Sequence, residues 1–286
     1  MTVAGIDVAH KTLVVVIRTE EKNAKAQDFA NTPEGHAALL VALGAARVER
    51  VCLEATGSYH LDLALAIETR RIPLMVVNPK AAKRFAEALF TRTKTDAVDA
   101  MLAEFAQRMP FEPWVRPAAS ALALRAYARR LAALTDARTQ AKNQLHALSQ
   151  TASTPAMILE DVQLTITECD AHLERLRTAA LAMIEAETTL QTPFELLTSV
   201  KGIAAASAIQ ILGEVLVLPP DLCAKQWVAM AGLDPRQSIS GTSINKKPRI
   251  SKAGNRHLRQ ALYMPALSAM MNTFGVTTVI SLKTVD

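Results

Sequence analysis

Four acidic residues of this chain stand where the local sequence predicts the end of a strand or the start of a helix. Asp7 and Glu54 each close a short run of apolar and β-branched residues typical of a β-strand. Asp96 and Asp99 fall in the first turn of a helix predicted over residues 95–107. Their spacing of three puts both side chains on one face of that helix. We predict that the four carboxylates meet in space.

Carboxylates that converge repel one another unless a cation neutralises them, and hard divalent ions prefer oxygen ligands. We therefore predict Mg²⁺ as the cofactor, held by this acidic tetrad. Two such ions about 3.5–4 Å apart activate the attacking oxygen and stabilise the leaving oxygen in phosphodiester chemistry. Arg92 and Lys94 precede the helix that carries the last two acids, so they are candidates for phosphate contacts at its positive end.

Each acidic motif also has a simpler interpretation. The Gly-Ile-Asp sequence that ends at Asp7 opens actin-like kinases and chaperones as well, and a single Asp after a strand is often only a turn former. Asp96 can serve as a first-turn acid favoured by the helix dipole, and its role as metal ligand or as support for Asp99 stays open. Glu54 favours the metal site, because it ends a buried strand in a loop of small residues.

A second chemically suggestive stretch, residues 223–263, carries eight Lys or Arg residues against one acid, Asp234. We predict that it contacts nucleic-acid phosphates. Ser240 precedes Gly241 in a polar loop that leads into a basic helix, so its hydroxyl is a candidate nucleophile. Most serines in such loops are only turn residues. The residues assigned here to nucleic-acid contact are Arg236, Lys246, Lys247, Arg249, Lys252, Asn255, Arg256 and Arg259.

Residues 197–204 have the pattern of a helix-hairpin-helix, in which a tight turn presents backbone N–H groups to a DNA phosphate. Lys201 in this turn is a further candidate for nucleic-acid contact. The match is partial, because Ala204 occupies the position of the second glycine usual in such hairpins. An ordinary helical hairpin is almost as well supported.

The elements that must position these groups begin with an α/β domain over residues 1–113. Its strands alternate with helices, which predicts a mixed sheet with flanking helices. The cluster Pro110, Pro113 and Pro117 forbids a continuing helix and marks the domain boundary. A chain of 286 residues is long enough for two domains that each bury their own core.

Beyond the prolines, apolar residues recur at alternating steps of three and four through residues 118–190, with a polar break near residues 151–155. This stripe predicts an antiparallel coiled-coil stalk of two helices. Two amphipathic helices packed on a globular core are the alternative. Residues 194–286 change to short helices separated by glycine and predict a small α-helical C-terminal domain.

Composition narrows the class of protein further. The net charge of +5 and pI near 9.2 favour nucleic-acid binding only weakly by themselves. The longest apolar runs are too short for a membrane span, and no secretory signal opens the chain, so we expect a cytoplasmic protein without a membrane partner. Three separated cysteines without a CxxC pair argue against a disulfide framework and a zinc knuckle.

Taken in order, these motifs resemble the insertion-sequence-110 (DEDD) family of transposases over nearly the whole chain. The single pieces are weak signals, but their combination in this order is highly specific. They are Gly5-Ile6-Asp7, Leu53-Glu54-Ala55-Thr56-Gly57, Lys94-Thr95-Asp96-Ala97-Val98-Asp99-Ala100, Ala231-Gly232-Leu233, Ser240-Gly241 and Ile250-Ser251-Lys252-Ala253-Gly254-Asn255.

The resemblance implies an RNase H-like, RuvC-like N-terminal domain whose tetrad of Asp7, Glu54, Asp96 and Asp99 holds Mg²⁺. It also implies that Ser240 forms a transient phosphoserine link to DNA, which conserves the bond for rejoining. The implied partners are double-stranded donor and target DNA, a structured guide RNA that pairs with both, and further copies of the chain in a homodimer or tetramer whose subunits share the two sites.

Two rival functions stay open at this point. A junction-resolving nuclease would use the same four acids with water as the attacking group, and a catalytically inactive remnant of a transposon would only bind nucleic acid. The chain also departs from the family, because the helix near Tyr263 is followed by a short Thr- and Val-rich end rather than a further basic segment. We therefore expect a truncated serine-bearing domain.

Overall fold

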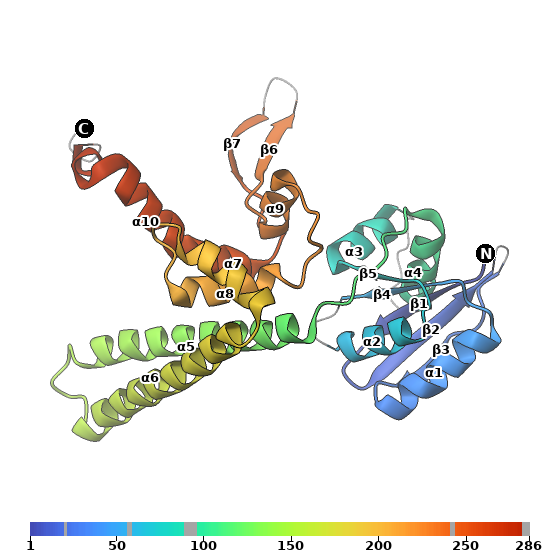
Figure 1. Ribbon diagram of the computed structural model, residues 1–286, viewed down its shortest axis with the longest axis horizontal. Coiled ribbons are helices and arrows are strands. Elements are labelled where there is room, and N and C mark those ends of the chain that lie inside the picture. The colour runs from blue at the N-terminus through green and yellow to red at the C-terminus, as the bar shows by residue number, and fades with distance from the viewer. Residues whose placement is uncertain (20–21, 56–58, 89–95, 241–243, 282–286) are drawn as a thin grey trace. The chain divides into compact units, whose positions relative to one another are not determined.

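The computed structural model describes residues 1–19, 22–55, 59–88, 96–240 and 244–281, with the backbone alone for residues 96–100, 238–240, 244–246 and 272–281. The chain divides into two compact units, Met1–Arg116 and Pro117–Asp286 (Figure 1). Across these described residues, the helices are too short or too polar to cross a membrane. The predicted subdivision into residues 1–113, 118–190 and 194–286 stays a prediction.

The N-terminal unit is built on a five-stranded sheet in the order β3-β2-β1-β4-β5. Antiparallel pairing joins β1 to β2 and β2 to β3, whereas β4 runs parallel to both β1 and β5. The predicted mixed sheet is therefore confirmed. The strands are β1 (Val3–Val8), β2 (Thr12–Arg18), β3 (Gln27–Ala30), β4 (Arg50–Glu54) and β5 (Leu74–Val77).

Four helices flank this sheet (Figure 1). They are α1 (Pro33–Ala45), α2 (Leu61–Thr69), α3 (Pro79–Ala88) and α4 (Asp96–Arg108). On one face, Ile6 and Leu53 pack with residues of α1 and α2, whereas Val3 and Cys52 pack on the other face with residues of α3 and α4. Apolar side chains alternate between the two faces, as strands buried on both sides require.

Two long helices open the C-terminal unit, α5 (Ala119–Leu148) and α6 (Ala156–Glu185), and they form a helical hairpin (Figure 1). Near its open end, Leu124 and Ile184 join a core with residues of α7 (Thr188–Thr198) and α8 (Ala205–Val215). Toward the turn, Ala141, Val162 and Ile166 form a separate cluster. One half of the hairpin thus belongs to a globular core and the other half extends as a helix pair, while its supercoiling stays a prediction.

The remaining elements are α9 (Ala224–Ala231), β6 (Pro235–Ser240), β7 (Ile244–Ile250) and α10 (Arg256–Ser281). β6 and β7 form an antiparallel two-stranded sheet. The small α-helical domain expected here does contain mainly helices, but the polar loop expected around Ser240 is wrong, because these residues belong to two strands. The side chains of β6 and β7 that the structure describes, residues 235–237 and 247–250, are all exposed, so they do not show the alternation that reveals a half-buried strand.

Candidate functional sites: an acidic sheet edge and a basic hairpin

Asp7 and Glu54 lie on neighbouring strands of the N-terminal sheet, near the carboxyl ends of β1 and β4, which are called the acidic edge below. In the parallel pairing of β1 with β4, Ile6 is the register partner of Leu53, and the two acids are the residues that follow. Side chains alternate along a strand, so residues an even number of positions apart point to the same face. Glu54 is two residues after Cys52 and Asp7 is four residues after Val3, and both Cys52 and Val3 point to the face covered by α3 and α4. Both carboxylates therefore leave the sheet on this same face.

The last turn of α4 lies near the start of β1. The Arg18 guanidinium donates from Nε to Gln107 Oε1 at 2.7 Å, and Arg18 is the register partner of Val3 at the start of β1. The last turn of α4 therefore lies where β1 begins. A 13-residue helix spans about 20 Å, so its first turn lies far from that contact. That this turn meets the acidic edge stays a prediction. Asp96 is its first residue and Asp99 lies in its first turn.

The chemistry of this edge fits a hard divalent cation, because the two carboxylates placed side by side offer oxygen ligands only. Among residues whose side chains the structure describes, no group of three or more His, Cys, Asp or Glu is arranged to hold a metal. The side chains of Asp96 and Asp99 lie outside that set, as do Arg92 and Lys94 altogether.

The β6–β7 hairpin concentrates positive charge. Arg236 and Arg249 are direct register partners across the two strands, and both side chains are exposed. Like charges in this position destabilise a sheet unless an anion lies between them. Lys247 is also exposed and lies two residues before Arg249 on β7, near the irregularity in the strand pairing. The described part of the hairpin therefore offers three cations to the phosphate backbone of a nucleic acid. Ser240 ends β6 and pairs with Ile244, while Gly241 lies outside the described residues.

At the base of this hairpin, the backbone around Gly232 packs closely against residues 252–254. Gly232 has a φ of 64° and follows α9, and a Cβ on it would come within 2.5 Å of the Gly254 nitrogen. Lys252 also has a positive φ, 53°, which is uncommon for a residue other than glycine, and its N–H donates to the Gly232 carbonyl at 2.9 Å. Only glycine at position 232 allows the two segments to approach this closely.

Two family models match the chain. The model of the IS110-type DEDD transposases matches residues 4–152, which include the acidic edge and more than half of the sequence. The chain belongs to this transposase family. The model of the transposase IS116/IS110/IS902 family matches residues 194–276, which include the basic hairpin. The family expected from the motifs is thereby confirmed.

Two curated proteins resemble this transposase along most of its length. The pilin gene-inverting protein of Moraxella lacunata is 27% identical over 274 residues, and that of Moraxella bovis is 26% identical over 276 residues. In each case the match covers 93% of this chain and 82% of the relative.

Among solved structures, the chain is similar to two of RuvC from Thermus thermophilus, one in complex with a Holliday junction substrate. Both are 19% identical, cover 40% of this chain and 98% or 99% of RuvC, and have a TM-score of 0.31.

Two of the predicted nucleic-acid contacts are engaged inside the protein. The Arg259 guanidinium donates from one nitrogen to the carbonyl oxygens of Ala231 and Gly254, at 2.9 and 3.0 Å, and so ties α10 to the base of the β6–β7 hairpin. Asn255 caps α10, because its Oδ1 accepts from the backbone of His257. Contact of these two with nucleic acid stays a prediction. The predicted contacts with exposed side chains are Lys201, Arg236, Lys247, Arg249, Lys252 and Arg256.

Lys201 lies in a tight turn between α7 and α8. Gly202 has a φ of 98°, and the N–H of Ile203 donates to the carbonyl of Val200 at 3.0 Å. A Cβ on Gly202 would lie 3.0 Å from Ser268 of α10, so the turn packs against that helix. The structure therefore gives a helical hairpin at this place, and its contact with DNA stays a prediction.

An ion pair between a buried carboxylate and a partly exposed arginine, which the sequence did not reveal, supports the base of the β6–β7 hairpin. The Arg129 guanidinium of α5 donates to both carboxylate oxygens of Glu214 in α8, at 2.7 and 3.1 Å. Asn255 Nδ2 donates to the same carboxylate at 2.6 Å. The Glu214 side chain is only 2% exposed. Glu214 thus connects α5, through Arg129, to Asn255, the residue that caps α10.

Replacing Glu214 with glutamine is expected to lower the free energy of unfolding of the C-terminal unit by about 2 kcal/mol, because a buried amide NH₂ group then faces the donors of Arg129 and Asn255. Urea denaturation followed by circular dichroism measures this change. Glu174→Gln is the matched control: Glu174 pairs with Arg177 on the surface, and its loss should cost less than about 0.5 kcal/mol. Equal effects of the two changes would contradict a supporting role for Glu214.

The same pair gives a pH dependence. Burial raises the pKa of Glu214, but hydrogen bonds from Arg129 and Asn255 outweigh it and hold this pKa below the ordinary value of 4.5. A depressed pKa means that the unfolded chain binds more protons, so this contribution is present above pH 4.5 and is lost as pH falls through the lower folded value. The loss of stability below pH 4.5 should therefore be smaller in Glu214→Gln than in the unchanged chain.

Proposed function

We propose that this chain is a DNA transposase that cuts and rejoins DNA with a Mg²⁺-binding acidic site and a serine nucleophile. The observation that carries the proposal is the position of Asp7 and Glu54, which directly follow the paired residues Ile6 and Leu53 of two neighbouring parallel strands, on the face against which α4 packs. Asp96 and Asp99, in the first turn of α4, complete the proposed tetrad. A bound Mg²⁺ pair supplies the charge that stabilises the attacking and leaving oxygens of a phosphodiester.

In the proposed reaction, the Ser240 Oγ loses its proton and bonds to the phosphorus of a DNA phosphodiester, while the bond from phosphorus to one sugar oxygen breaks. That oxygen takes up a proton and leaves as a hydroxyl group. A hydroxyl of the second DNA strand then attacks the phosphoserine, which rejoins DNA and restores the serine. Exposed Arg236 and Arg249 on the same hairpin support this role, because they offer cations to the phosphate.

The proposed partners are double-stranded donor and target DNA, a structured RNA that guides the choice of target, and further copies of the chain in a homodimer or tetramer. Curated relatives described as pilin gene-inverting proteins support the recombination of DNA as the outcome of the reaction. Guide pairing would leave the protein to contact mainly the backbone of the nucleic acid, which agrees with the exposed cations of the hairpin.

Recombination between two plasmids tests this function. One plasmid carries the ends of the element and the other a target, and the RNA transcribed beside the gene is added with the full chain. We expect new DNA junctions in Mg²⁺, their loss in EDTA, and a protein–DNA adduct after a rapid quench in detergent. Cleavage without an adduct would indicate a junction-resolving nuclease, and DNA binding without cleavage in Mg²⁺ would indicate an inactive remnant.

A further inference from the structure

A cavity of about 580 Å³ lies between α1 and α2, within the N-terminal unit. It is separate from the acidic edge, because α1 and α2 cover one face of the sheet and the carboxylates of Asp7 and Glu54 point to the other. Pockets that bind small molecules have volumes of about 300–1,000 Å³, so this cavity is large enough for a ligand. The side chains that line it indicate which kind.

One end of the cavity carries a pair of exposed aromatic rings. The ring centroids of His10 and Tyr59 are 5.1 Å apart, and Tyr59 is 46% exposed. Asn31 holds the backbone beside both rings, because its Nδ2 donates to the carbonyl oxygens of Ala9 and Tyr59 at 2.9 and 3.2 Å. A ring that is exposed to solvent on a well-held backbone is a platform on which a nucleobase can stack.

Two opposite charges follow the rings along α2. Asp62, Ala66 and Arg70 line the cavity at intervals of four residues, so they share one face of the helix, and Arg70 lies about 12 Å beyond Asp62. In the described part of the chain, no hydrogen bond or salt bridge engages either charged side chain. Burial lowers the pKa of His36, which also lines the cavity, and the charge of Asp62 opposes this effect. The Asp62 carboxylate therefore lies near the imidazole ring of His36, in the middle of the cavity.

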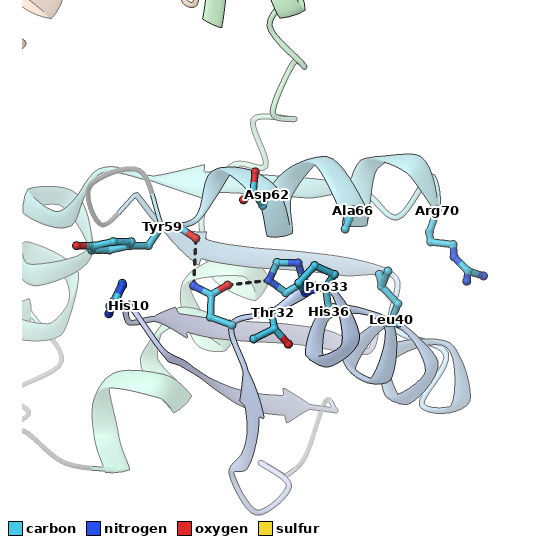
Figure 2. A pocket seen from close by; sticks show the side chains of 11 residues that line it. His10, Thr32, Pro33, His36, Leu40, Tyr59, Asp62, Ala66 and Arg70 are labelled. Atoms are coloured by element: carbon cyan, nitrogen blue, oxygen red, sulfur yellow. Dashed lines mark hydrogen bonds between the residues drawn. The ribbon is translucent and has the colours of Figure 1, made fainter. Parts of the chain in front are cut away.

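The order of these groups matches the order of the parts of a nucleotide. Figure 2 shows His10 and Tyr59 at one end of the cavity, Arg70 at the other, and Asp62 between them. A nucleotide has a flat base, a sugar with hydroxyl groups, and a phosphate. The Tyr59 ring suits the base, the Asp62 carboxylate can accept from a sugar hydroxyl, and the Arg70 guanidinium can pair with the phosphate. Since a carboxylate only accepts, it favours ribose, whose 2′-hydroxyl donates and is absent from DNA.

We propose that this cavity binds one unpaired ribonucleotide, with its base on Tyr59, its 2′-hydroxyl on Asp62 and its phosphate at Arg70. A nucleotide of an RNA strand and a free ribonucleotide share this chemistry. The inference goes beyond the proposed function, which assigns no residue of this cavity, and it requires neither the acidic metal site nor Ser240.

The fluorescence of 2-aminopurine, which falls when this base stacks, tests the proposal with the full chain. The probes are an RNA tetranucleotide that contains 2-aminopurine and the DNA tetranucleotide of the same sequence. Salt at about 0.5 M weakens phosphate contacts with the basic hairpin, and EDTA keeps the acidic edge free of metal. We expect the RNA to bind at least about fivefold more tightly than the DNA, because only ribose donates a hydrogen bond to the charged carboxylate.

The 5′-monophosphate of 2-aminopurine riboside is the third probe and separates the two sources of the ligand. Affinity equal to that of the RNA tetranucleotide would support the cavity as a site for a free ribonucleotide. Weaker binding of the single nucleotide would support it as a site for one residue of an RNA strand. If none of the three probes loses fluorescence with the full chain, the cavity is not a nucleotide site.

Matched variants assign the binding to this cavity. Tyr59→Ala should weaken RNA binding at least about fivefold, whereas Tyr59→Phe keeps the ring and should bind within about twofold of the unchanged chain. Asp62→Ala should give RNA and DNA equal affinity, because it removes the acceptor that distinguishes the two sugars. Glu34→Ala is the control for this change: Glu34 is an exposed acid in the first turn of α1, as Asp62 is in α2, but it does not line the cavity. It should keep the preference for RNA.

Three results would overturn the proposal: equal binding of RNA and DNA by the unchanged chain, an unchanged affinity in Tyr59→Ala, or a loss of the preference in Glu34→Ala as well. The proposed function fails on different evidence. Plasmid recombination that needs no added RNA would contradict the guide and leave the ribonucleotide site intact, whereas recombination guided by RNA together with normal tetranucleotide binding by Tyr59→Ala would contradict only the site.

Discussion

Replacing Asp7 with asparagine is expected to lower the rate of Mg²⁺-dependent DNA cleavage about a thousandfold or more. Asparagine has nearly the same shape, so the pairing of β1 with β2 and β4 should persist. The change removes one negative charge from a pair of adjacent carboxylates, and with it a ligand of the proposed metal. A loss of several kcal/mol of transition-state stabilisation corresponds to about three orders of magnitude in rate.

Two measurements make this result specific for Asp7. Single-turnover cleavage of a labelled plasmid gives the rate, and filter binding gives the affinity for DNA, which should stay the same or increase because a negative charge has been removed. Asp28→Asn is the control: Asp28 is an exposed carboxylate of the same sheet, in β3, paired with Val14 of β2. Its rate should stay within about twofold of the unchanged chain. Cleavage at the normal rate by Asp7→Asn would contradict the metal site.

The strands next to the acidic edge could be predicted from sequence because they are buried on both faces. β1 and β4 therefore contain nearly continuous apolar residues, which end at Asp7 and Glu54. β3 gives no such signal, since it lies at the edge of the sheet and Phe29 is its only half-buried side chain. The position of an acid at a strand end was thus predictable, while the full width of the sheet was not.

Polar residues that bond to distant segments of the chain could not be predicted from the sequence. Asn31 looks like an ordinary turn or cap residue, and its two carbonyl partners lie 22 and 28 residues away along the chain. Glu214 is the one charged residue of α8, and its partners lie 85 and 41 residues away. A hydrogen bond over such distances depends on tertiary packing, so no local pattern of charge or hydropathy indicates it.

For the β6–β7 hairpin, the sequence predicted the positive charge but not the two strands that carry it. The density of Lys and Arg is a property of composition and was visible directly, whereas the described side chains of the two strands are exposed and show no alternation with buried ones. The structure adds the register, in which Arg236 and Arg249 are partners. Two guanidinium groups held opposite each other make a far better phosphate site than the same residues scattered over a loop, since a single anion can neutralise both.

Replacing Ser240 with alanine should therefore remove the protein–DNA adduct to the limit of detection, while DNA binding stays within about twofold, because the cations of the hairpin are unchanged. Ser240 lies four residues after Arg236 on the same strand, at the end of β6. Ser238→Ala is the control, since this serine shares the strand and the surrounding charge but is not the proposed nucleophile. Denaturing gels of quenched plasmid reactions measure the adduct. If the adduct persists in Ser240→Ala, another residue forms the link to DNA; if it disappears in Ser238→Ala as well, the hairpin as a whole rather than one hydroxyl group accounts for its loss.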